Sequence, residues 1–579
     1  MSRSNADIAA VFEEVAELLE WQQANAFRVR AYRNAARTIA SWPEAMADLI
    51  ARDGRLDELP TIGRDLAGKI GEIVRRGSCD LLDRLRSSSP PGITDLLHIS
   101  GLGPRRVHAL YHELGIHTPT QLLDAAREAR IRSLPGFGPR SEQRLAEAAA
   151  GYLERSRRWP LARVTPIVDA LQTWLRTAPG VARVVMAGSF RRRRETVGDL
   201  DILIAAQPGP ALTRYLTGFE QVDSILSRGP SRTSVVLHGG LQVDFRVVAA
   251  TEFGAALVYF TGSRAHTIAL RRIARSRKLK INEYGVYRGR KRIAGDTEAS
   301  VYGSIGLPWI PPELRENRGE IEAARDGTLP KLVQRRDLRG DLHAHTQASD
   351  GRESLEQMAQ AAKAAGLKYL AITDHSRRLA IANGLDPGRL AAQIDAIDQL
   401  NEKLSGIVLL KGIEVDILPD GRLDLPDALL ARLDLVVGAV HSDLELSRAR
   451  QTTRILRAMD RPNFSILAHP NGRLFGSRGP CQLDMDLIID HARERGCFLE
   501  LDSQPDRLDM FDTQCRRARE AGVMVAISSD AHHGSDLRWL ELGVDQARRG
   551  WLQAGDVLNA LPLGQLRRML ARTMTQARK

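Results

Sequence analysis

The sequence contains few cysteines and no long apolar run. Its four cysteines, at positions 79, 481, 497 and 515, have no metal-like spacing, and we expect ordinary reduced thiols. No segment has the length of a membrane span, so a membrane partner is not expected. The N-terminal stretch MSRSNADIAAVFEEVAELLE lacks the apolar core of a signal peptide and carries acidic residues that transit peptides avoid. We therefore expect a cytoplasmic protein.

The chain is, in contrast, long and strongly basic. Its 579 residues are several times the usual length of one domain, which predicts three or four folded units. A net charge of +12 and a pI near 9.8 favour a polyanionic partner, and nucleic acid fits best when no membrane segment is present.

Up to about residue 160 the apolar residues follow a helical period, and one pattern recurs three times. The copies are LPTIGRDLAGKI, ISGLGPRRVHAL and LPGFGPRSEQRL, each a short turn that leads into a helix. Free backbone N–H groups at such a helix start can face a DNA phosphate. The copies resemble helix-hairpin-helix elements, and we expect DNA contacts at Gly63, Gly101, Gly103, Gly136 and Gly138.

Between about 160 and 250 the pattern changes to strands, and one strand carries two aspartates. Side chains alternate along a strand, so Asp199 and Asp201 share a face, and Asp244 occupies the same kind of position in a later strand. Three carboxylates that converge favour a divalent cation, Mg²⁺ or Mn²⁺, in a two-metal site for phosphoryl transfer. The alternative is that these aspartates lie at a sheet edge and pair with nearby arginines.

The motif around the aspartates resembles family X DNA polymerases. The Gly-Ser turn in AGSF, the run Arg191 to Arg194 that follows, the D-x-D strand, and the continuation VYFTGSRAHTIALRRIARSRKLKINEYGVY are similar to the palm and thumb of that family. The resemblance spans about residues 1 to 315. It implies that Asp199, Asp201 and Asp244 are catalytic metal ligands, and that the incoming nucleotide contacts Gly188, Ser189, Arg192, Tyr259, Phe260 and Gly262. It also implies contacts with the template strand, or a role in organising the closed state of the enzyme, for Arg271, Asn282, Glu283 and Tyr284.

Three positions deserve separate mention in this comparison. Arg264 and Thr267 stand where familiar eukaryotic members have an aspartate over the incoming base and a minor-groove asparagine. Lys69 falls on the lysine that some members use as a Schiff-base nucleophile against an abasic sugar. That chemistry needs a lowered lysine pKa, and the alternative is a solvated lysine that binds phosphate.

Residues 337 to 579 contain seven apolar runs, each followed by polar residues. Strands with functional residues at their C-terminal ends are typical of an α/β barrel, and seven runs predict a distorted one. The mouth of this barrel would collect His343, His345, Asp350, His375, Glu414, His441, His469, Asp530 and His532. Six imidazoles and three carboxylates exceed the needs of one ion, so two or three Zn²⁺, Mn²⁺ or Fe ions are expected.

This ligand set resembles that of the PHP (polymerase and histidinol phosphatase) phosphoesterases at all nine positions. The resemblance implies a metal-dependent phosphoesterase. Arg473 is a candidate for a substrate phosphate, and Asp374 is a candidate to orient a ligand or to form a salt bridge at the rim.

Together these observations predict a multidomain protein: a helical N-terminal region, an α+β nucleotidyltransferase palm and thumb, and a distorted (β/α)7 PHP barrel. The expected boundaries are 1–85 for a small lyase-like domain, 86–160 for a fingers-like domain, 161–250 for the palm, 251–315 for the thumb, 316–336 for a linker and 337–579 for the PHP domain.

The expected function is that of a monomeric DNA polymerase that uses deoxynucleoside triphosphates to fill short gaps in gapped or nicked DNA. The PHP site would trim or process 3′ ends, and cutting at abasic sites is a further expected activity. Two alternatives stay open: a PHP nuclease or small-molecule phosphatase on a weak or inactive polymerase module, and a non-catalytic scaffold that binds DNA ends.

Overall fold

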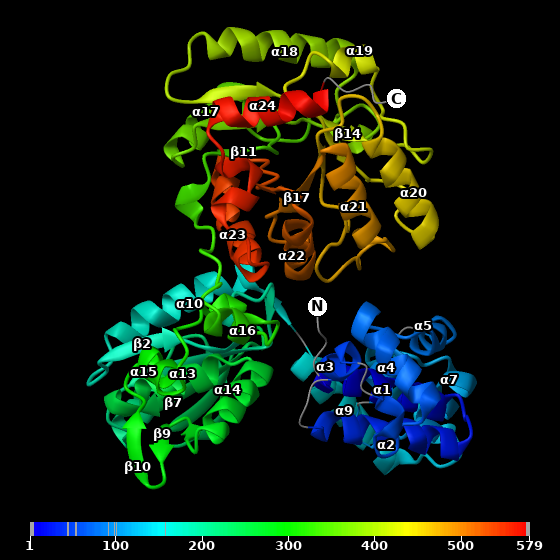
Figure 1. Ribbon diagram of the computed structural model, residues 1–579, viewed down its shortest axis with the longest axis vertical. Coiled ribbons are helices and arrows are strands. Elements are labelled where there is room, and N and C mark those ends of the chain that lie inside the picture. Colours follow the sequence, from blue (N-terminus) through cyan, green and yellow to red (C-terminus); the bar gives the residue numbers. More distant parts are fainter. Residues whose placement is uncertain are drawn as a thin grey trace. The chain divides into compact units, whose positions relative to one another are not determined.

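The computed structural model describes residues 5–42, 46–52, 55–90, 92–97, 99, 101–156 and 158–574. The chain divides into two compact units, Met1–Arg158 and Trp159–Lys579 (Figure 1). The predicted fold class is confirmed, with a helical N-terminal region, an α+β region at the predicted palm and thumb, and a barrel of parallel strands at the predicted PHP domain.

The first unit is helical and has two hydrophobic clusters. One cluster draws on residues between Ile8 and Leu85, and the other on residues between Ile93 and Ala149 together with Trp21. The helices are α1 (Asn5–Trp21), α2 (Ala26–Ser41), α3 (Met46–Ala51), α4 (Arg64–Arg76), α5 (Asp80–Ser87), α6 (Ile93–Leu97), α7 (Pro104–Leu114), α8 (Pro119–Arg127) and α9 (Pro139–Ser156).

The three repeated turns share one backbone conformation. Thr61, Gly101 and Gly136 occupy the same place in their motifs and have φ angles of 67°, 88° and 80°. Glycine is the usual residue in this left-handed region, so Thr61 is the unusual member. Gly63 and Gly103 then cap α4 and α7 without a side-chain hydrogen bond, which leaves their helix-start N–H groups open to a ligand.

The palm is a five-stranded sheet with strand order β2-β4-β7-β6-β5. Strands β4 and β7 are parallel, and the other neighbouring pairs are antiparallel. The strands are β2 (Arg183–Met186), β4 (Asp199–Ala205), β5 (Val222–Arg228), β6 (Arg232–Leu237) and β7 (Gln242–Val248); the helices of this region are α10 (Leu161–Arg176), α11 (Gly188–Arg191), α12 (Pro210–Leu216) and α13 (Phe253–Thr261).

Two features of the palm differ from the sequence pattern. Strand β5 was not predicted, because from Asp223 to Arg228 both of its faces are exposed and the apolar alternation is absent. The Gly-Ser turn is a single-turn helix, α11. A short antiparallel pair joins β1 (Trp159–Pro160), which precedes α10, to β3 (Thr196–Val197), which lies between α11 and β4.

The thumb contains α14 (Arg264–Ser276), a three-stranded sheet and α15 (Glu298–Ser304). Its strands are β8 (Lys280–Asn282), β9 (Gly285–Arg288) and β10 (Lys291–Ala294).

The segment 316–336 is not the exposed linker that its charge suggested. It contains helix α16 (Glu320–Arg325), and Ile321, Ala324 and Leu332 are buried in the thumb core. Glu320 is fully buried, and its Oε1 lies 2.5 Å from Nδ1 of His266. Glu320, which sequence alone reads as solvated, is hydrogen-bonded by His266 and by the backbone N–H groups of Asn317 and Arg318.

The C-terminal domain is a barrel of parallel strands in two sheets. The strand orders are β11-β12-β13 and β14-β15-β16-β17-β18. The parallel bridges His375↔Glu414 and Ala344↔Ala531 join the two sheets into a ring. The strands are β11 (Gly340–Asp341), β12 (Tyr369–Ile372), β13 (Val408–Lys411), β14 (Glu414–Asp416), β15 (Val437–Ala439), β16 (Ile466–Leu467), β17 (Phe498–Asp502) and β18 (Val525–Ser528). The run VLLKGIEVD therefore forms two strands, β13 and β14, where one was expected.

Helices surround the barrel (Figure 1), and the last helix, α24 (Leu563–Met574), packs against side chains of its strands. Leu566 and Leu570 of α24 belong to the cluster of strand side chains that includes Tyr369 and Phe498. The larger helices are α17 (Leu355–Ala364), α18 (Pro387–Asn401), α20 (Arg448–Met459), α21 (Met485–Arg495), α22 (Asp512–Ala521), α23 (Leu540–Arg549) and α24 (Leu563–Met574), and α19 (Asp427–Leu430) is a single turn.

Candidate functional site

The nine residues predicted as PHP ligands converge at one end of the barrel. Glu414 is the central group, and imidazole nitrogens from four strand ends surround its carboxylate. The distances to its oxygens are 2.7 Å from His375 Nδ1, 2.9 Å from His469 Nε2, 3.2 Å from His441 Nε2, 3.5 Å from His343 Nε2 and 3.8 Å from His345 Nε2.

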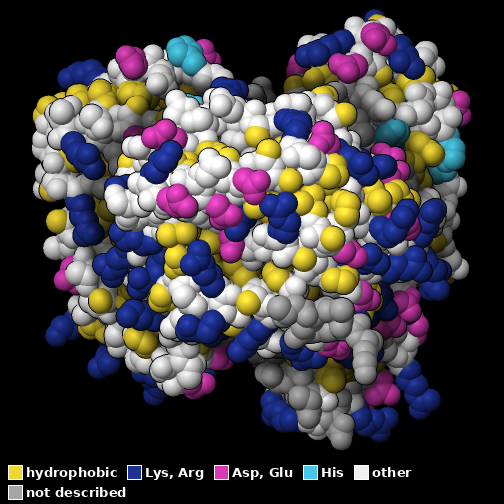
Figure 2. Space-filling view, turned by 90° about the horizontal axis from the view of Figure 1, so that it is seen from above, with side chains coloured by type: hydrophobic (Ala, Val, Ile, Leu, Met, Phe, Trp, Pro, Cys, Tyr) yellow, Lys and Arg dark blue, Asp and Glu magenta, His cyan; other side chains and the backbone are white. Residues whose placement is uncertain are grey.

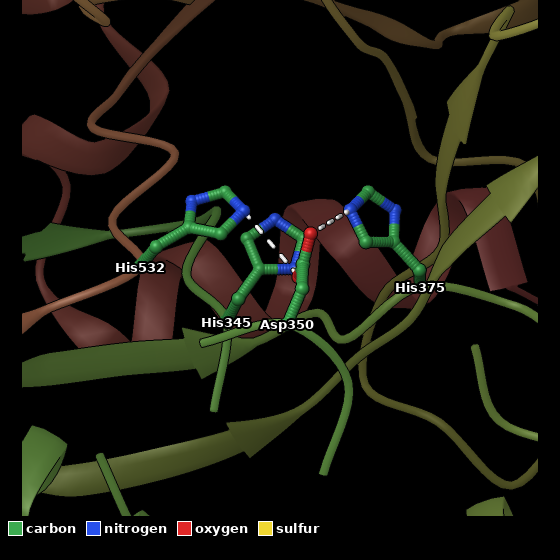
Figure 3. Close-up of side chains that lie close together, drawn as sticks. All are labelled: His345, Asp350, His375 and His532. Atoms are coloured by element: carbon green, nitrogen blue, oxygen red, sulfur yellow. Dashed lines mark ion pairs between the residues drawn. The ribbon is translucent and has the colours of Figure 1, made fainter. Parts of the chain in front are cut away.

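Two further carboxylates complete the group. Asp530 Oδ1 lies 2.9 Å from His345 Nε2 and 3.8 Å from His343 Nε2. Asp350 lies 3.4 Å from both His375 Nε2 and His532 Nε2. Figure 3 shows these side chains pointing toward one another, with the Asp350 carboxylate between the rings of His375 and His532.

The donor atoms of this site fit bound metal ions. Three groups of ligand atoms each lie within 4.8 Å of one another: His345, Asp350, His375 and His532; His343, His345 and Asp530; His375, Glu414 and His441. Several of these atoms are buried and make no hydrogen bond: His343 Nε2, both ring nitrogens of His345, His375 Nδ1, Glu414 Oε2 and Asp530 Oδ1. Buried polar atoms normally have partners, and a metal cluster would supply them here.

The crowding of charges shifts the pKa values of the site in opposite directions. Burial acts to raise the pKa of Glu414, but the charges of the surrounding histidines outweigh it and hold that pKa well below its usual range. Burial acts to lower the pKa of His375, but Glu414 and Asp350 raise it to about 10. Burial and the neighbouring charge of His375 lower the pKa of His345 to about 4.

Two carboxylates that orient the ligands were missed by sequence reasoning. Glu500, at 0% exposure, accepts hydrogen bonds from His343 Nδ1 at 2.8 Å and from the backbone N–H of His469 at 3.0 Å. Asp416 lies 3.2 Å from His441 Nδ1. Glu500 lies inside the strand FLELD of β17, and Asp416 ends β14, two residues after the ligand Glu414; these placements are the signals that could have found them.

A pocket of about 290 Å³ opens onto the ligands. Arg507 lines it beside His469, Glu414 and Asp530, and Leu379, Ile381 and Ala382 form its apolar part. The Arg507 guanidinium lies 4.0 Å from Asp502, which is weak pairing for a cation, and sequence reasoning did not single it out.

Two predictions about the rim were wrong. Arg473 does not face the pocket as a free cation: it pairs through both terminal nitrogens with Glu195 of the palm, at 3.1 and 2.8 Å, and packs on Phe475 and Phe511. Asp374 orients no imidazole. It accepts hydrogen bonds from Thr346 and Ser349, and so holds the loop that leads to Asp350.

In the palm, two of the three predicted aspartates face each other across neighbouring strands. Asp201 of β4 and Asp244 of β7 are register partners, and Asp199 pairs in register with Gln242. Burial and the charges of Asp199 and Asp244 raise the pKa of Asp201 to about 7. Three carboxylates in this arrangement fit a hard divalent cation, which would relieve their repulsion.

Gly188 packs directly against Asp201. Its φ is +59°, and a Cβ atom placed there would lie 2.5 Å from Asp201 Oδ2. Only glycine allows both this backbone conformation and this approach. The α11 turn, which carries Ser189, is thereby held beside the aspartates.

All four arginines of the run that begins at the last residue of α11 face carboxylates within the second unit. Arg191 pairs with Glu298 of the thumb at 2.7 Å, and Arg192 with Glu316 at 3.0 Å. Arg193 lies 3.6 Å from Asp545 of the PHP domain, and Arg194 lies 3.9 Å from Glu316. Most of the charge of this run therefore stabilises contacts between domains.

The remaining predicted nucleotide and template residues gather around the end of α13. Arg192 Nη1 donates a hydrogen bond to the carbonyl of Thr261, next to Gly262. The guanidinium carbon of Arg271 lies 5.1 Å from the centre of the Tyr259 ring. That of Arg246 lies 4.8 Å from the centre of the Phe260 ring. Farther along the thumb, Tyr284 is 49% exposed and Asn282 accepts its backbone N–H. At the start of α14, Arg264 is exposed, and Thr267 is buried with no hydrogen bond to its hydroxyl.

Lys69 lies on α4 of the first unit and is paired with Asp65, four residues earlier. Burial acts to lower the pKa of Lys69, but the hydrogen bond and charge of Asp65, together with Tyr32, outweigh it and raise that pKa. A Schiff-base nucleophile needs the opposite shift, so this geometry favours the phosphate-binding interpretation.

Basic side chains are spread over the surface, as the net charge of +12 requires. Figure 2 shows Lys and Arg across the visible face, with acidic residues interspersed. The four cysteines are free. Among the described helices, none is long and apolar enough to cross a bilayer.

Four family models match parts of the chain. A helix-hairpin-helix domain covers residues 3–79, and a SAM-like helix-hairpin-helix tandem covers 93–150. The DNA polymerase beta thumb covers 256–316, and the PHP domain covers 341–472.

Curated relatives match either the whole chain or its C-terminal part. The DNA polymerase/3′-5′ exonuclease PolX of Bacillus subtilis (strain 168) is 35% identical over 570 residues, which is 98% of this chain and 99% of that protein. A probable phosphatase of Thermoanaerobacter sp. (strain X514) is 29% identical over 38% of this chain and 89% of its own length. Another, from Caldanaerobacter subterraneus subsp. tengcongensis, is 30% identical over 33% of this chain and 75% of its own length. The resemblance inferred from the motifs is confirmed, and the chain belongs to the PolX type of family X DNA polymerases with a C-terminal PHP domain.

Proposed function

We propose that this protein fills short gaps in DNA as a DNA polymerase and that its PHP domain removes or processes nucleotides at the 3′ end. The observation that carries the proposal is the end-to-end match to a polymerase/3′-5′ exonuclease, on a chain whose two sites both retain their ionisable residues.

In the polymerase reaction, Asp199, Asp201 and Asp244 hold Mg²⁺ or Mn²⁺, and Gly188 and Ser189 present the α11 turn to the triphosphate. Ions bound there would supply the positive charge that phosphoryl transfer needs. Arg192 bonds the carbonyl of Thr261 beside Gly262, and its charge acts on Asp201, so among the four arginines we assign it the contact with a phosphate. Tyr259 and Phe260 form the wall beside the nucleotide, while Arg271 and Tyr284 face the template.

In the nuclease reaction, the nine PHP ligands hold two or three Zn²⁺, Mn²⁺ or Fe ions. Those ions provide Lewis acidity at phosphorus and a water nucleophile at neutral pH. Arg507 is the cation on the pocket wall, and we assign it the role in binding a substrate phosphate that the sequence suggested for Arg473. Glu500 and Asp416 fix the orientation of His343 and His441.

Gapped or nicked DNA is the proposed substrate, bound by a monomer. The helix starts after Gly63 and Gly103 have no side-chain cap, so their N–H groups can bind phosphates, and we extend this role to the turns at Gly101, Gly136 and Gly138. Lys69 belongs to this phosphate-binding surface.

The test is a time course on a 5′-labelled primer in a one-nucleotide gap, with Mn²⁺, with and without deoxynucleotides. Extension by about one nucleotide with them and shortening without them supports both activities. Asp244→Ala removes extension and leaves shortening, whereas His345→Ala does the reverse. If the wild-type protein only shortens the primer, the result favours a nuclease on an inactive polymerase module. If the primer does not change, the result favours a scaffold that binds DNA ends.

A small-molecule phosphatase is the second candidate for the PHP site, because proteins described as probable phosphatases match this part of the chain. Hydrolysis of histidinol phosphate or p-nitrophenyl phosphate by the full chain, without shortening of DNA, would favour it over the nuclease.

A further inference from the structure

The palm turn that follows α11 is held by the PHP domain as well as by the palm. Residues 191–195 connect α11, beside the catalytic aspartates, to β3. Arg549 at the end of α23 donates to the carbonyl of Arg192 at 2.8 Å, and Arg473 forms the paired contact with Glu195. Gln546, on the same face of α23, donates to Glu195 at 3.3 Å.

The Arg549 contact is part of a buried ion network. Arg549 Nη1 also lies 3.0 Å from Glu316 Oε1, the atom that accepts Arg192 Nε at 3.0 Å. Its other terminal nitrogen bonds Asp512 at 2.7 Å, and Arg318 Nη1 bonds the same carboxylate oxygen at 2.9 Å. Only 3% of the Arg549 side chain is exposed, so these contacts are little screened by water.

The arrangement of this network determines where the Arg192 guanidinium lies. One edge of Arg192 is bound to Glu316, and another bonds the carbonyl of Thr261 beside Gly262. Glu316 is itself oriented by Arg549. The position of Arg192 relative to the catalytic carboxylates therefore depends on a side chain of the nuclease domain.

We propose that Arg549 and Arg473 are positioning residues for the polymerase reaction: through Glu316 and Glu195 they hold the turn 188–195 in the geometry that accepts the incoming triphosphate. This inference rests on the proposed polymerase function. The PHP domain then has two roles, one as a phosphoesterase and one as a structural part of the nucleotide site.

Arg549→Met is the informative substitution. Methionine keeps most of the aliphatic volume, while Arg192 still faces Glu316 and Arg318 still faces Asp512, so neither carboxylate is left buried without a cation. Arg519→Met is the matched control, because Arg519 forms a partly buried ion pair with Asp556 inside the PHP domain. Glu195→Gln weakens the contact from the palm side.

Two measurements on the full chain test the proposal. In single-nucleotide gap filling, Arg549→Met and Glu195→Gln should raise the KM for the deoxynucleotide roughly tenfold and change kcat little, since a small misplacement of a binding group weakens binding. Arg549→Lys should recover part of the loss, and Arg519→Met should match the wild type. Amide hydrogen exchange should become faster in peptides covering 188–195 and stay unchanged in peptides covering β5.

The outcomes separate this inference from the proposed function. If both variants extend the primer with the wild-type KM, the inference alone is overturned. It is also overturned if the variants lose nuclease activity in parallel with extension, because that indicates a general loss of fold. A wild type that does not extend primers overturns the proposed polymerase function. Hydrogen exchange then decides the inference: unchanged exchange at 188–195 in Arg549→Met refutes the positioning role.

Discussion

Replacement of Glu500 by glutamine should disable the nuclease without touching a predicted metal ligand. Each oxygen of this buried carboxylate accepts one hydrogen bond, from His343 Nδ1 at 2.8 Å and from the backbone N–H of His469 at 3.0 Å. A glutamine has one acceptor oxygen and one NH₂ group at these two places. The backbone N–H cannot change its role, so the oxygen must serve it and the NH₂ must face His343 Nδ1.

That exchange reverses the tautomer of His343. Nδ1 becomes the acceptor and the proton moves to Nε2, the atom that points at Glu414 and Asp530 and that makes no hydrogen bond. A protonated Nε2 cannot ligate a metal. The opposite orientation of the amide leaves the His469 N–H unsatisfied, at a cost of about 1–3 kcal/mol. Changes to partners of metal ligands typically lower affinity or activity by about 10–100-fold, and we expect that range.

The assay is Mn²⁺ titration of metal-depleted protein by calorimetry, with the primer-shortening rate measured at the same Mn²⁺ concentrations. Glu520→Gln is the control, because Glu520 is on the outside of the same domain and pairs with Arg516. Primer extension at the palm should be equal in all three proteins. Wild-type Mn²⁺ affinity in Glu500→Gln would refute the argument from the tautomer.

Three further predictions concern the other groups. Gly188→Ala should reduce primer extension at least tenfold and spare the nuclease, because its φ of +59° and the 2.5 Å approach to Asp201 leave no room for a methyl group; wild-type extension rates would contradict this. Asp65→Asn should lower the pKa of Lys69, so borohydride trapping on incised abasic DNA should give more adduct than in the wild type, and an equal yield would show that the ion pair does not limit the lysine. Arg507→Gln should raise the KM for DNA in the shortening reaction about tenfold, the expected loss for one charge-assisted phosphate contact, and an unchanged KM would remove Arg507 from the phosphate site.

The PHP centre was predictable from sequence because its chemistry is local to strand ends. In a parallel barrel every strand delivers its C-terminal residues to one rim, so an apolar run followed by histidine or a carboxylate locates a ligand without knowledge of the tertiary structure. The same reasoning did not reach Glu500 or Asp416. Glu500 lies within β17 and Asp416 ends β14 close behind Glu414, and only the structure shows that they contact the imidazoles.

The palm strands β4 and β7 were predictable for a similar reason, since alternation places each aspartate on a known face. Strand β5 lacks that alternation and was missed. The segment 316–336 was misjudged because Glu320 is buried and hydrogen-bonded to His266, which lies 54 residues earlier in the chain.

The partners of the four consecutive arginines could not be predicted from the sequence. Their charge predicts an anionic partner, but charge alone does not distinguish a triphosphate from a carboxylate of the same chain. The structure places Glu298 and Glu316 of the polymerase part and Asp545 of the PHP domain against them. These partners lie more than 100 residues away in sequence, and no periodicity connects them. A run that resembles a substrate contact is therefore chiefly the junction of three domains, and the nucleotide site, at Arg192, depends on how that junction is assembled.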